Sequence, residues 1–249
     1  MIFRQLFEPL SCTYTYLLGC EATGQAVLID PVVNCLDRDL AVLRSLGLTL
    51  AYTLDTHIHA DHITGALHLK QRVGSQIAGP AMDALPCTDL GLVDGTPLQV
   101  GRLQLMPLHT PGHTAGHFAY ALPDRVFTGD TLLIDGCGRT DFQQGDASAL
   151  YRSVSDKLFS LPDDTLVFPG HDYHGRRVSC IAQEKTRNPR LGQGRSQAHF
   201  VDLMAELKLP YPKFIDFAVP GNQQCGVCPT DLPEQLQMYC ERMVGSVQG

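Results

Sequence analysis

The pattern of apolar and polar residues along this chain predicts strands and helices in alternation. Two apolar runs, Tyr14 to Leu18 and Gln25 to Asp30, flank a Thr-Gly pair and predict a hairpin. Leu36 to Leu46 ends just before Gly47, which is typical of a helix closed by a glycine. The alternation predicts an α/β protein.

Further apolar runs each predict a strand that ends in a turn. These runs are Ala51 to Thr56, Leu103 to Leu108, Arg125 to Gly129 and Leu166 to Gly170. Asp61 to Arg72 has apolar residues at helical spacing and predicts a helix after the first strand. Two more helices are expected at Val178 to Arg187 and Gln197 to Leu207. We see no repeat or low-complexity linker, so residues 1–249 are expected to form one domain.

Three histidines and an aspartate follow the first of these strands. They are His57, His59, Asp61 and His62, within the sequence THIHADH. Burying three imidazole rings together would require a partner for every ring nitrogen, and a divalent cation supplies one. His57 and His59 lie two apart in extended backbone and therefore point the same way, while Asp61 and His62 open the next helix and face back. The motif predicts a metal site.

The other three strands end in residues of the same kind. His113, Asp130 and His171 each follow a glycine turn. Each of these pairs alone is typical of an ordinary turn. Together with the histidine motif, they predict that four loops carry metal ligands to one edge of a sheet, where functional residues of α/β proteins usually lie.

This set of residues resembles the metallo-β-lactamase superfamily. The resemblance implies an αββα sandwich, in which two mixed sheets carry outer helices and the metal lies at one edge. It matches His57, His59 and His113 to a first metal site, Asp61, His62 and His171 to a second, and Asp130 to a bridging carboxylate. Hydrolases, nucleases, oxygen reductases and dioxygenases share this motif, so it leaves the reaction open.

A more specific segment is Gly138 to Gly145, which reads GRTDFQQG. With residues 171–175 (HDYHG), 188–190 (NPR) and 215–220 (IDFAVP), it makes nearly the whole chain similar to the persulfide dioxygenases. The alternative is a glyoxalase II type thioesterase, which uses two metal ions to cleave an acyl-glutathione. Those enzymes share the early Gly-Cys-Gly, but typically continue with a basic residue and Phe-Phe-Glu-Gly.

The resemblance to persulfide dioxygenases implies one Fe(II) per chain, bound by His57, His113 and Asp130. Two histidines and one carboxylate leave positions open for O₂ and substrate. The remaining residues of the motif would hydrogen-bond the ligands and the metal-bound waters, and they are His59, Asp61, His62 and His171. All seven ligands of a dinuclear zinc site are present, so the residues alone leave the two-metal alternative open.

The implied reaction is the oxidation of glutathione persulfide by O₂ to glutathione and sulfite. Arg139 is the candidate for binding the glutathione carboxylates, and Tyr173 for a contact near the reacting sulfur. Arg190 is expected to make a weaker charge contact. Arg139 has an alternative role, since it could hold its own loop against Asp141.

The composition of the chain limits which binding partners and which cell compartment we expect. A net charge of −7 gives no broad basic surface, which counts against a nucleic-acid partner and so against a nuclease. No apolar run is long enough to span a membrane, and Arg4 and Glu8 interrupt the N-terminus, which therefore reads as neither a signal nor a transit peptide. The nine scattered cysteines indicate a reducing cytoplasm. We expect Cys225 and Cys228 to be free or adventitious thiols, the alternative being a redox pair.

The chain after Pro229 is too short for the C-terminal sulfurtransferase domain that some relatives carry. Any sulfur-transfer partner is therefore expected to be a separate protein. We also expect a homodimer.

Overall fold

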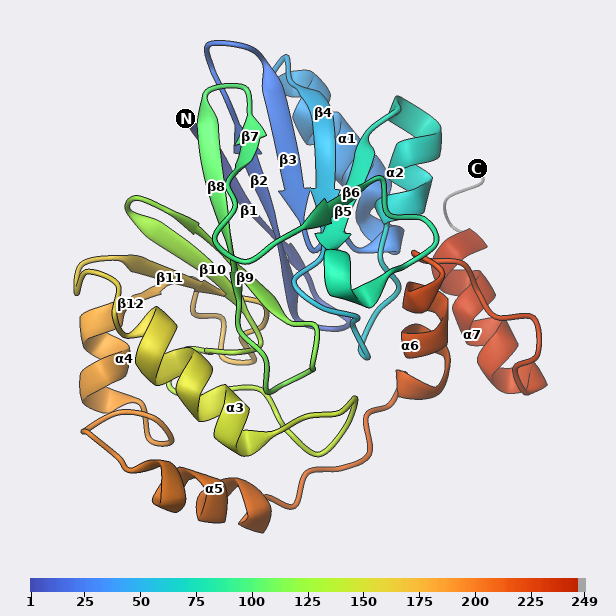
Figure 1. Ribbon diagram of the computed structural model, residues 1–249. Helices are drawn as coiled ribbons and strands as arrows, with labels where there is room; N and C mark the ends of the chain where they lie inside the picture. Colours follow the sequence, from blue (N-terminus) through green and yellow to red (C-terminus); the bar gives the residue numbers. More distant parts are fainter. Residues whose placement is uncertain (246–249) are drawn as a thin grey trace. The chain divides into compact units, whose positions relative to one another are not determined.

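The computed structural model describes residues 1–245 (Figure 1). The chain divides into two compact units. The first contains residues 1–92, 99–104 and 211 onward, and the second contains residues 93–98 and 105–210. Two mixed six-stranded sheets form the framework, one in the first unit and one mainly in the second. The expected single domain stays a prediction.

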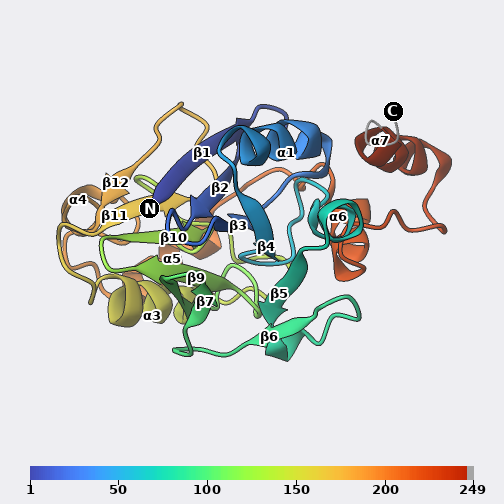
Figure 2. The ribbon, with the colours of Figure 1, turned by 90° about the horizontal axis from the view of Figure 1, so that it is seen from above.

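The first sheet has its strands in sequence order, which Figure 2 shows from β1 to β6. The strands are β1 (Ile2–Glu8), β2 (Thr13–Gly19), β3 (Gln25–Ile29), β4 (Thr49–Leu54), β5 (Gln76–Pro80) and β6 (Leu90–Leu92). The β1–β2 and β2–β3 pairs are antiparallel, and the remaining pairs are parallel. The predicted β2–β3 hairpin is confirmed, whereas β1 was not predicted.

Helices of the first unit, all but η2, bury apolar side chains in one core with this sheet. They are η1 (Val33–Cys35), α1 (Leu36–Ser45), α2 (Ala66–Val73), η2 (Ala81–Asp83), α6 (Ile215–Gln223) and α7 (Glu234–Gly245). Leu17 and Leu28 from the strands pack with Leu36, Ile63 and Phe217, and each of these side chains is at most 1% exposed. Among the described residues, none of the helices has both the length and the apolar character that crossing a membrane requires.

The prediction that a helix begins at Asp61 is wrong, because α2 begins at Ala66. The backbone before Ala66 bonds to other segments instead of to a helical ladder. The Ile63 carbonyl accepts from Val33 N at 2.9 Å, and Gly65 N donates to the Pro31 carbonyl at 2.7 Å. The residues that precede α2 are therefore held as a loop.

The second sheet has the order β12-β11-β10-β9-β8-β7. Its strands are β7 (Leu98–Val100), β8 (Leu103–His109), β9 (Phe118–Leu122), β10 (Arg125–Gly129), β11 (Leu166–Pro169) and β12 (Ser179–Cys180). β10 and β11 run parallel, which places the ends of both strands, and the turns after them, at one edge of the sheet. The predicted strands that lead to His113, Asp130 and His171 are confirmed.

The helices of the second unit are α3 (Ala147–Arg152), the π-helical turn η3 (Ser153–Leu158), α4 (Ile181–Arg187) and α5 (Gln197–Glu206). Leu150, Val154 and Phe200 from these helices are fully buried against Val126 of β10 and Val167 of β11. The helix predicted from Val178 starts three residues later, because Ser179 and Cys180 pair with β11 as β12.

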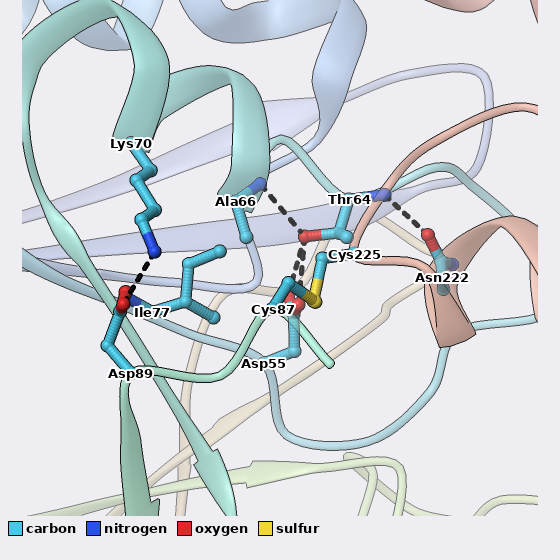
Figure 3. Close-up of a disulfide and its surroundings, with 9 residues drawn as sticks. All are labelled: Asp55, Thr64, Ala66, Lys70, Ile77, Cys87, Asp89, Asn222 and Cys225. Atoms are coloured by element: carbon cyan, nitrogen blue, oxygen red, sulfur yellow. Dashed lines mark hydrogen bonds and ion pairs between the residues drawn. A yellow bond between two sulfur atoms is a disulfide. The ribbon is translucent and has the colours of Figure 1, made fainter. Parts of the chain in front are cut away.

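Two disulfide bonds lie in the first unit, so the prediction that Cys225 and Cys228 are free thiols is wrong. Cys225 is bonded to Cys87, with Cα atoms 6.2 Å apart (Figure 3). Cys228 is bonded to Cys240, with Cα atoms 5.8 Å apart. The partners lie 138 and 12 residues away in the chain, so the spacing of the Cys-x-x-Cys pair gave no sign of them.

Candidate metal centre

The histidine loop, which we define as residues His57 to His62, follows β4 in the first unit. His57, His59 and His62 are all less than 5% exposed. The ring centroid of His59 lies 4.2 Å from that of His57 and 4.2 Å from that of His62. His59, Asp61 and His62 each offer one ligand atom within 4.8 Å of the others. The loop thus gathers the donors of the predicted motif at one place.

Asp30, at the end of β3, organises this loop and was missed by the sequence reasoning. Its Oδ1 atom accepts from His59 Nε2 at 3.0 Å and from Thr56 N at 2.6 Å. Its Oδ2 atom accepts from the Thr56 hydroxyl at 3.1 Å. Because that hydroxyl proton is directed to Asp30, the Thr56 oxygen accepts from His57 Nδ1 at 3.0 Å. The sequence does contain one signal for this role, because Asp30 is an aspartate at the end of a predicted apolar strand.

These bonds fix the two imidazoles in different ways. With its proton on Nδ1, His57 carries the lone pair on Nε2, the nitrogen suited to a metal ion. His59 uses Nε2 as the donor to Asp30. Burial lowers the pKa of His59, but the charge and hydrogen bond of Asp30 raise it to about 10. His59 is therefore held by a carboxylate inside the first unit.

Thr13, on β2, fixes the other end of the histidine loop. Its hydroxyl donates to Asp61 Oδ2 at 3.1 Å, and His62 Nδ1 donates to the same oxygen at 3.0 Å. Thr13 is fully buried, and the Ser11 hydroxyl lies 2.7 Å from its oxygen. Sequence reasoning missed Thr13, since a threonine in a strand is too common to attract notice.

His113, Asp130 and His171 meet in the second unit. His113 Nε2 lies 3.6 Å from Asp130 Oδ2, and His171 Nε2 lies 3.6 Å from Asp130 Oδ1. Both distances are too long for hydrogen bonds. The buried Oδ1 atom makes no hydrogen bond with any described residue. Two atoms that each bind one divalent ion at roughly 2.0 to 2.2 Å lie about 3.0 to 3.6 Å apart, so this donor set fits a metal.

Backbone groups fix the orientation of His113 and Asp130. His113 Nδ1 donates to the Arg139 carbonyl at 2.7 Å, which leaves the lone pair on Nε2, as in His57. A side chain at Gly138 would clash with the His113 ring, since its Cβ would lie 2.8 Å from Nδ1. Asp130 N donates to Nε2 of the buried His117 at 3.1 Å. His117 was missed, although its Gly-His pair repeats the one at His113.

Gly112 allows the loop that carries His113 to approach α3. Its φ of +137° lies outside the range that other residues readily adopt, and a Cβ atom there would clash with the backbone of Leu150. The Gly-His turn is therefore shaped by its packing against α3.

Arg139 lies on the loop after Asp130, and its guanidinium group is bound by its neighbours. Nε and Nη2 donate to the two carboxylate oxygens of Asp141 at 2.6 and 2.7 Å. Nη1 donates to the Pro210 carbonyl at 2.8 Å, and the guanidinium carbon lies 4.6 Å from the centroid of the Phe142 ring. The alternative that Arg139 holds its own loop against Asp141 thus has direct support.

The other two substrate candidates differ in exposure and contacts. Tyr173 is 70% exposed, and its ring lies parallel to that of His171 with centroids 6.1 Å apart. Arg190 Nη1 donates to the Cys137 carbonyl at 2.8 Å. Tyr173 therefore lies beside His171, a residue of the candidate metal centre, whereas Arg190 bonds to the backbone two residues before Arg139.

Comparison with known proteins shows which family the chain resembles. The model of the metallo-beta-lactamase superfamily matches residues 12–171. Persulfide dioxygenase ETHE1, mitochondrial, from Homo sapiens is 49% identical over 235 residues, which are 91% of this chain and 89% of that protein. Hydroxyacylglutathione hydrolase from Rhodospirillum rubrum is 38% identical, over 92% of this chain and 88% of that protein.

A solved structure agrees with the sequence comparison. The crystal structure of ETHE1 from Myxococcus xanthus superposes with a TM-score of 0.89 at 53% identity, covering 91% of this chain and all of that one. The predicted metallo-β-lactamase fold, of α/β class with two mixed sheets and helices, is confirmed.

Proposed function

Since the chain belongs to the metallo-β-lactamase superfamily and, within it, to the persulfide dioxygenases, we propose that it oxidises glutathione persulfide with O₂. One persulfide, one O₂ and one water give glutathione, sulfite and two protons. The observation that carries this proposal is the similarity to the human persulfide dioxygenase over nine-tenths of the chain. The hydrolase relative covers as much of the chain, but at 38% identity.

One Fe(II) per chain is bound by His57, His113 and Asp130. The geometry within each unit supports this ligand set. Both histidines have Nδ1 committed to a hydrogen bond, so each offers Nε2, and the Asp130 carboxylate has an oxygen 3.6 Å from that nitrogen of His113. Two imidazoles and one carboxylate form the donor set of non-haem iron oxygenases. When bound, the iron supplies the site at which O₂ and the terminal sulfur react.

The other residues of the motif hold water and orient ligands. His59 is committed to Asp30, and Asp61 and His62 are bonded to each other and to Thr13. His171 faces the second oxygen of the Asp130 carboxylate, with its Nε2 atom 3.6 Å from Oδ1. Partners of this kind typically affect metal affinity or activity by about 10 to 100-fold when removed.

Arg139 and Tyr173 bind the substrate, with a weaker contribution from Arg190. The described contacts of Arg139 use three of its five N–H donors, so two can still donate to a glutathione carboxylate. Tyr173 exposes its phenol beside His171, where it can contact the tripeptide near the sulfur. No side chain is needed as a nucleophile, because the persulfide sulfur reacts as an anion.

Metal analysis and O₂ uptake test the proposal together. Protein purified without oxygen should contain close to one iron per chain and consume O₂ when glutathione persulfide is added. Two zinc ions per chain, with hydrolysis of an acyl-glutathione and no O₂ uptake, would replace it with the thioesterase function. The homodimer, the cytoplasmic location and a separate sulfurtransferase stay predictions.

A further inference from the structure

Asn222, near the end of α6, bonds directly to the backbone of the histidine loop and of Thr64 just beyond it. Its side-chain nitrogen donates to the carbonyls of His59 at 2.9 Å and His62 at 2.8 Å. Its oxygen accepts from Thr64 N at 2.9 Å (Figure 3). Asn222 is 4% exposed, so these bonds are shielded from water.

The loop needs such a partner because it has no regular structure of its own. Buried carbonyl and N–H groups that lack a partner destabilise the folded state. One asparagine side chain satisfies three of these groups at once. It can do so only when the carbonyls of His59 and His62 point to the same place, so the bonds select one shape of the loop.

Asn222 is itself rigidly held. Phe217 and Ala218 anchor α6 in the core of the first unit, where both are fully buried. Immediately after the helix, the disulfide bond of Cys225 to Cys87 fixes the chain (Figure 3). Gly226 has a φ of +100°, and a side chain there would clash with the Thr64 carbonyl. Both ends of the segment that carries Asn222 are thus fixed beside the loop.

We propose that Asn222 is a positioning residue for the metal centre, which shapes the histidine loop before the metal binds. This inference rests on the metal centre proposed above. Asn222 donates to peptide groups within the loop, and the loop presents the imidazoles. Its loss should therefore weaken metal binding by freeing the backbone, without removing any ligand.

The test compares Asn222→Asp with a control in the same helix. The aspartate keeps an oxygen for Thr64 N but turns its second oxygen toward the carbonyls of His59 and His62, where the amide donated. Asn222→Ala removes all three bonds and serves if the aspartate variant does not fold. Phe217→Leu is the control, since it weakens the packing of α6 and leaves the bonds of Asn222 in place.

Two measurements are made on metal-free protein, so neither depends on persulfide oxidation. Titration with Fe(II) should show an affinity 10 to 100-fold lower in the Asn222 variants, the range typical of residues that orient metal ligands. Amide hydrogen exchange should show loss of protection in residues 57–64. In Phe217→Leu, the Fe(II) affinity and the protection of residues 57–64 should both stay near the wild-type values, even where this variant loses as much thermal stability as the Asn222 variants do.

Equal changes in metal affinity and loop protection in the Asn222 variants and Phe217→Leu would overturn the inference, because Asn222 would then only stabilise the fold. A thioesterase activity in the wild type would overturn the proposed function instead. It would leave the metal titration and the exchange data to decide the role of Asn222.

Discussion

His113 Nε2 and Asp130 Oδ2 lie 3.6 Å apart, too far for a hydrogen bond and close enough to share a metal ion. His113→Ala should therefore abolish iron binding. His62→Ala should keep most of the iron and lower turnover by about 10 to 100-fold, because His62 is bonded to Asp61 and not proposed as a ligand. Metal content and turnover of each variant check this, and an equal loss of metal in both would favour the dinuclear site.

Arg139→Ala should lower kcat/KM for glutathione persulfide by about 10 to 100-fold, with iron content unchanged. A charge-assisted contact is worth about 1.5 to 3 kcal/mol, and 1.36 kcal/mol corresponds to tenfold. A small persulfide without a distal carboxylate should be affected less, since it never makes the contact. Steady-state kinetics on the two substrates provide the measurement.

Asp141→Asn is the matched control, because it weakens the bonds that hold Arg139 and keeps the guanidinium charge. If Arg139 binds substrate, Asp141→Asn should retain most of the selectivity for glutathione persulfide. If Asp141→Asn reproduces the full effect of Arg139→Ala on both substrates, the arginine only holds its loop.

Asp39→Asn should stabilise the protein at neutral pH. Burial raises the pKa of Asp39 to about 6, although Arg38 acts in the opposite direction, and its Oδ2 atom makes no hydrogen bond with any described residue. The folded state thus binds a proton more tightly than the unfolded state, and stability falls as pH rises from about 4 to 6. The gain at pH 7 should be about 1 to 3 kcal/mol, by 1.36 kcal/mol per pKa unit, and should vanish near pH 4.

Urea unfolding at pH 7 and pH 4 measures this difference. Asp39→Asn keeps an oxygen that can accept from Arg38 Nε, which donates to Asp39 at 2.8 Å. A variant less stable than the wild type at pH 7 would show that the ion pair outweighs the cost of burying the charge.

The two disulfide bonds should differ in what they contribute to stability. Cys87 and Cys225 are 138 residues apart, whereas Cys228 and Cys240 are 12 apart. Loop-closure entropy gives about 5 kcal/mol for the longer loop and about 3 kcal/mol for the shorter one. Cys87→Ser should therefore lower the free energy of unfolding by about 2 kcal/mol more than Cys228→Ser.

Unfolding in urea without reductant tests this, and in a reducing buffer the two variants should become similar. Equal losses without reductant would mean that strain or residual structure, and not loop length, sets the contribution of each bond.

The strands, and the turns that carry the candidate ligands, could be predicted from the sequence because each carries a local signal. A short apolar run followed by a glycine turn and His113 or Asp130 can be recognised within about ten residues of sequence. The start of α2 could not be predicted, because the loop before Ala66 is fixed by bonds to Val33 and Pro31. Local spacing contains no trace of such partners.

The supporting residues of the candidate site were hidden for the same reason. Asp30 and Thr13 reach the histidine loop from strands 29 to 49 residues earlier in the chain. Cys87 and Cys225 are ordinary cysteines until the fold brings them together. Their roles depend on tertiary structure, whereas the pattern of residues along the sequence predicts only contacts within one helix, strand or turn.

The position of Asn222 in the chain has a consequence for synthesis. It bonds to carbonyls that lie 160 and 163 residues earlier in the chain. A nascent chain on the ribosome presents its histidines long before this asparagine emerges from the exit tunnel. Long-range contacts of this kind form late in folding. The proposed role of Asn222 therefore implies that a nascent chain that has not yet emerged as far as α6 holds its histidines in a loop that binds a metal ion weakly.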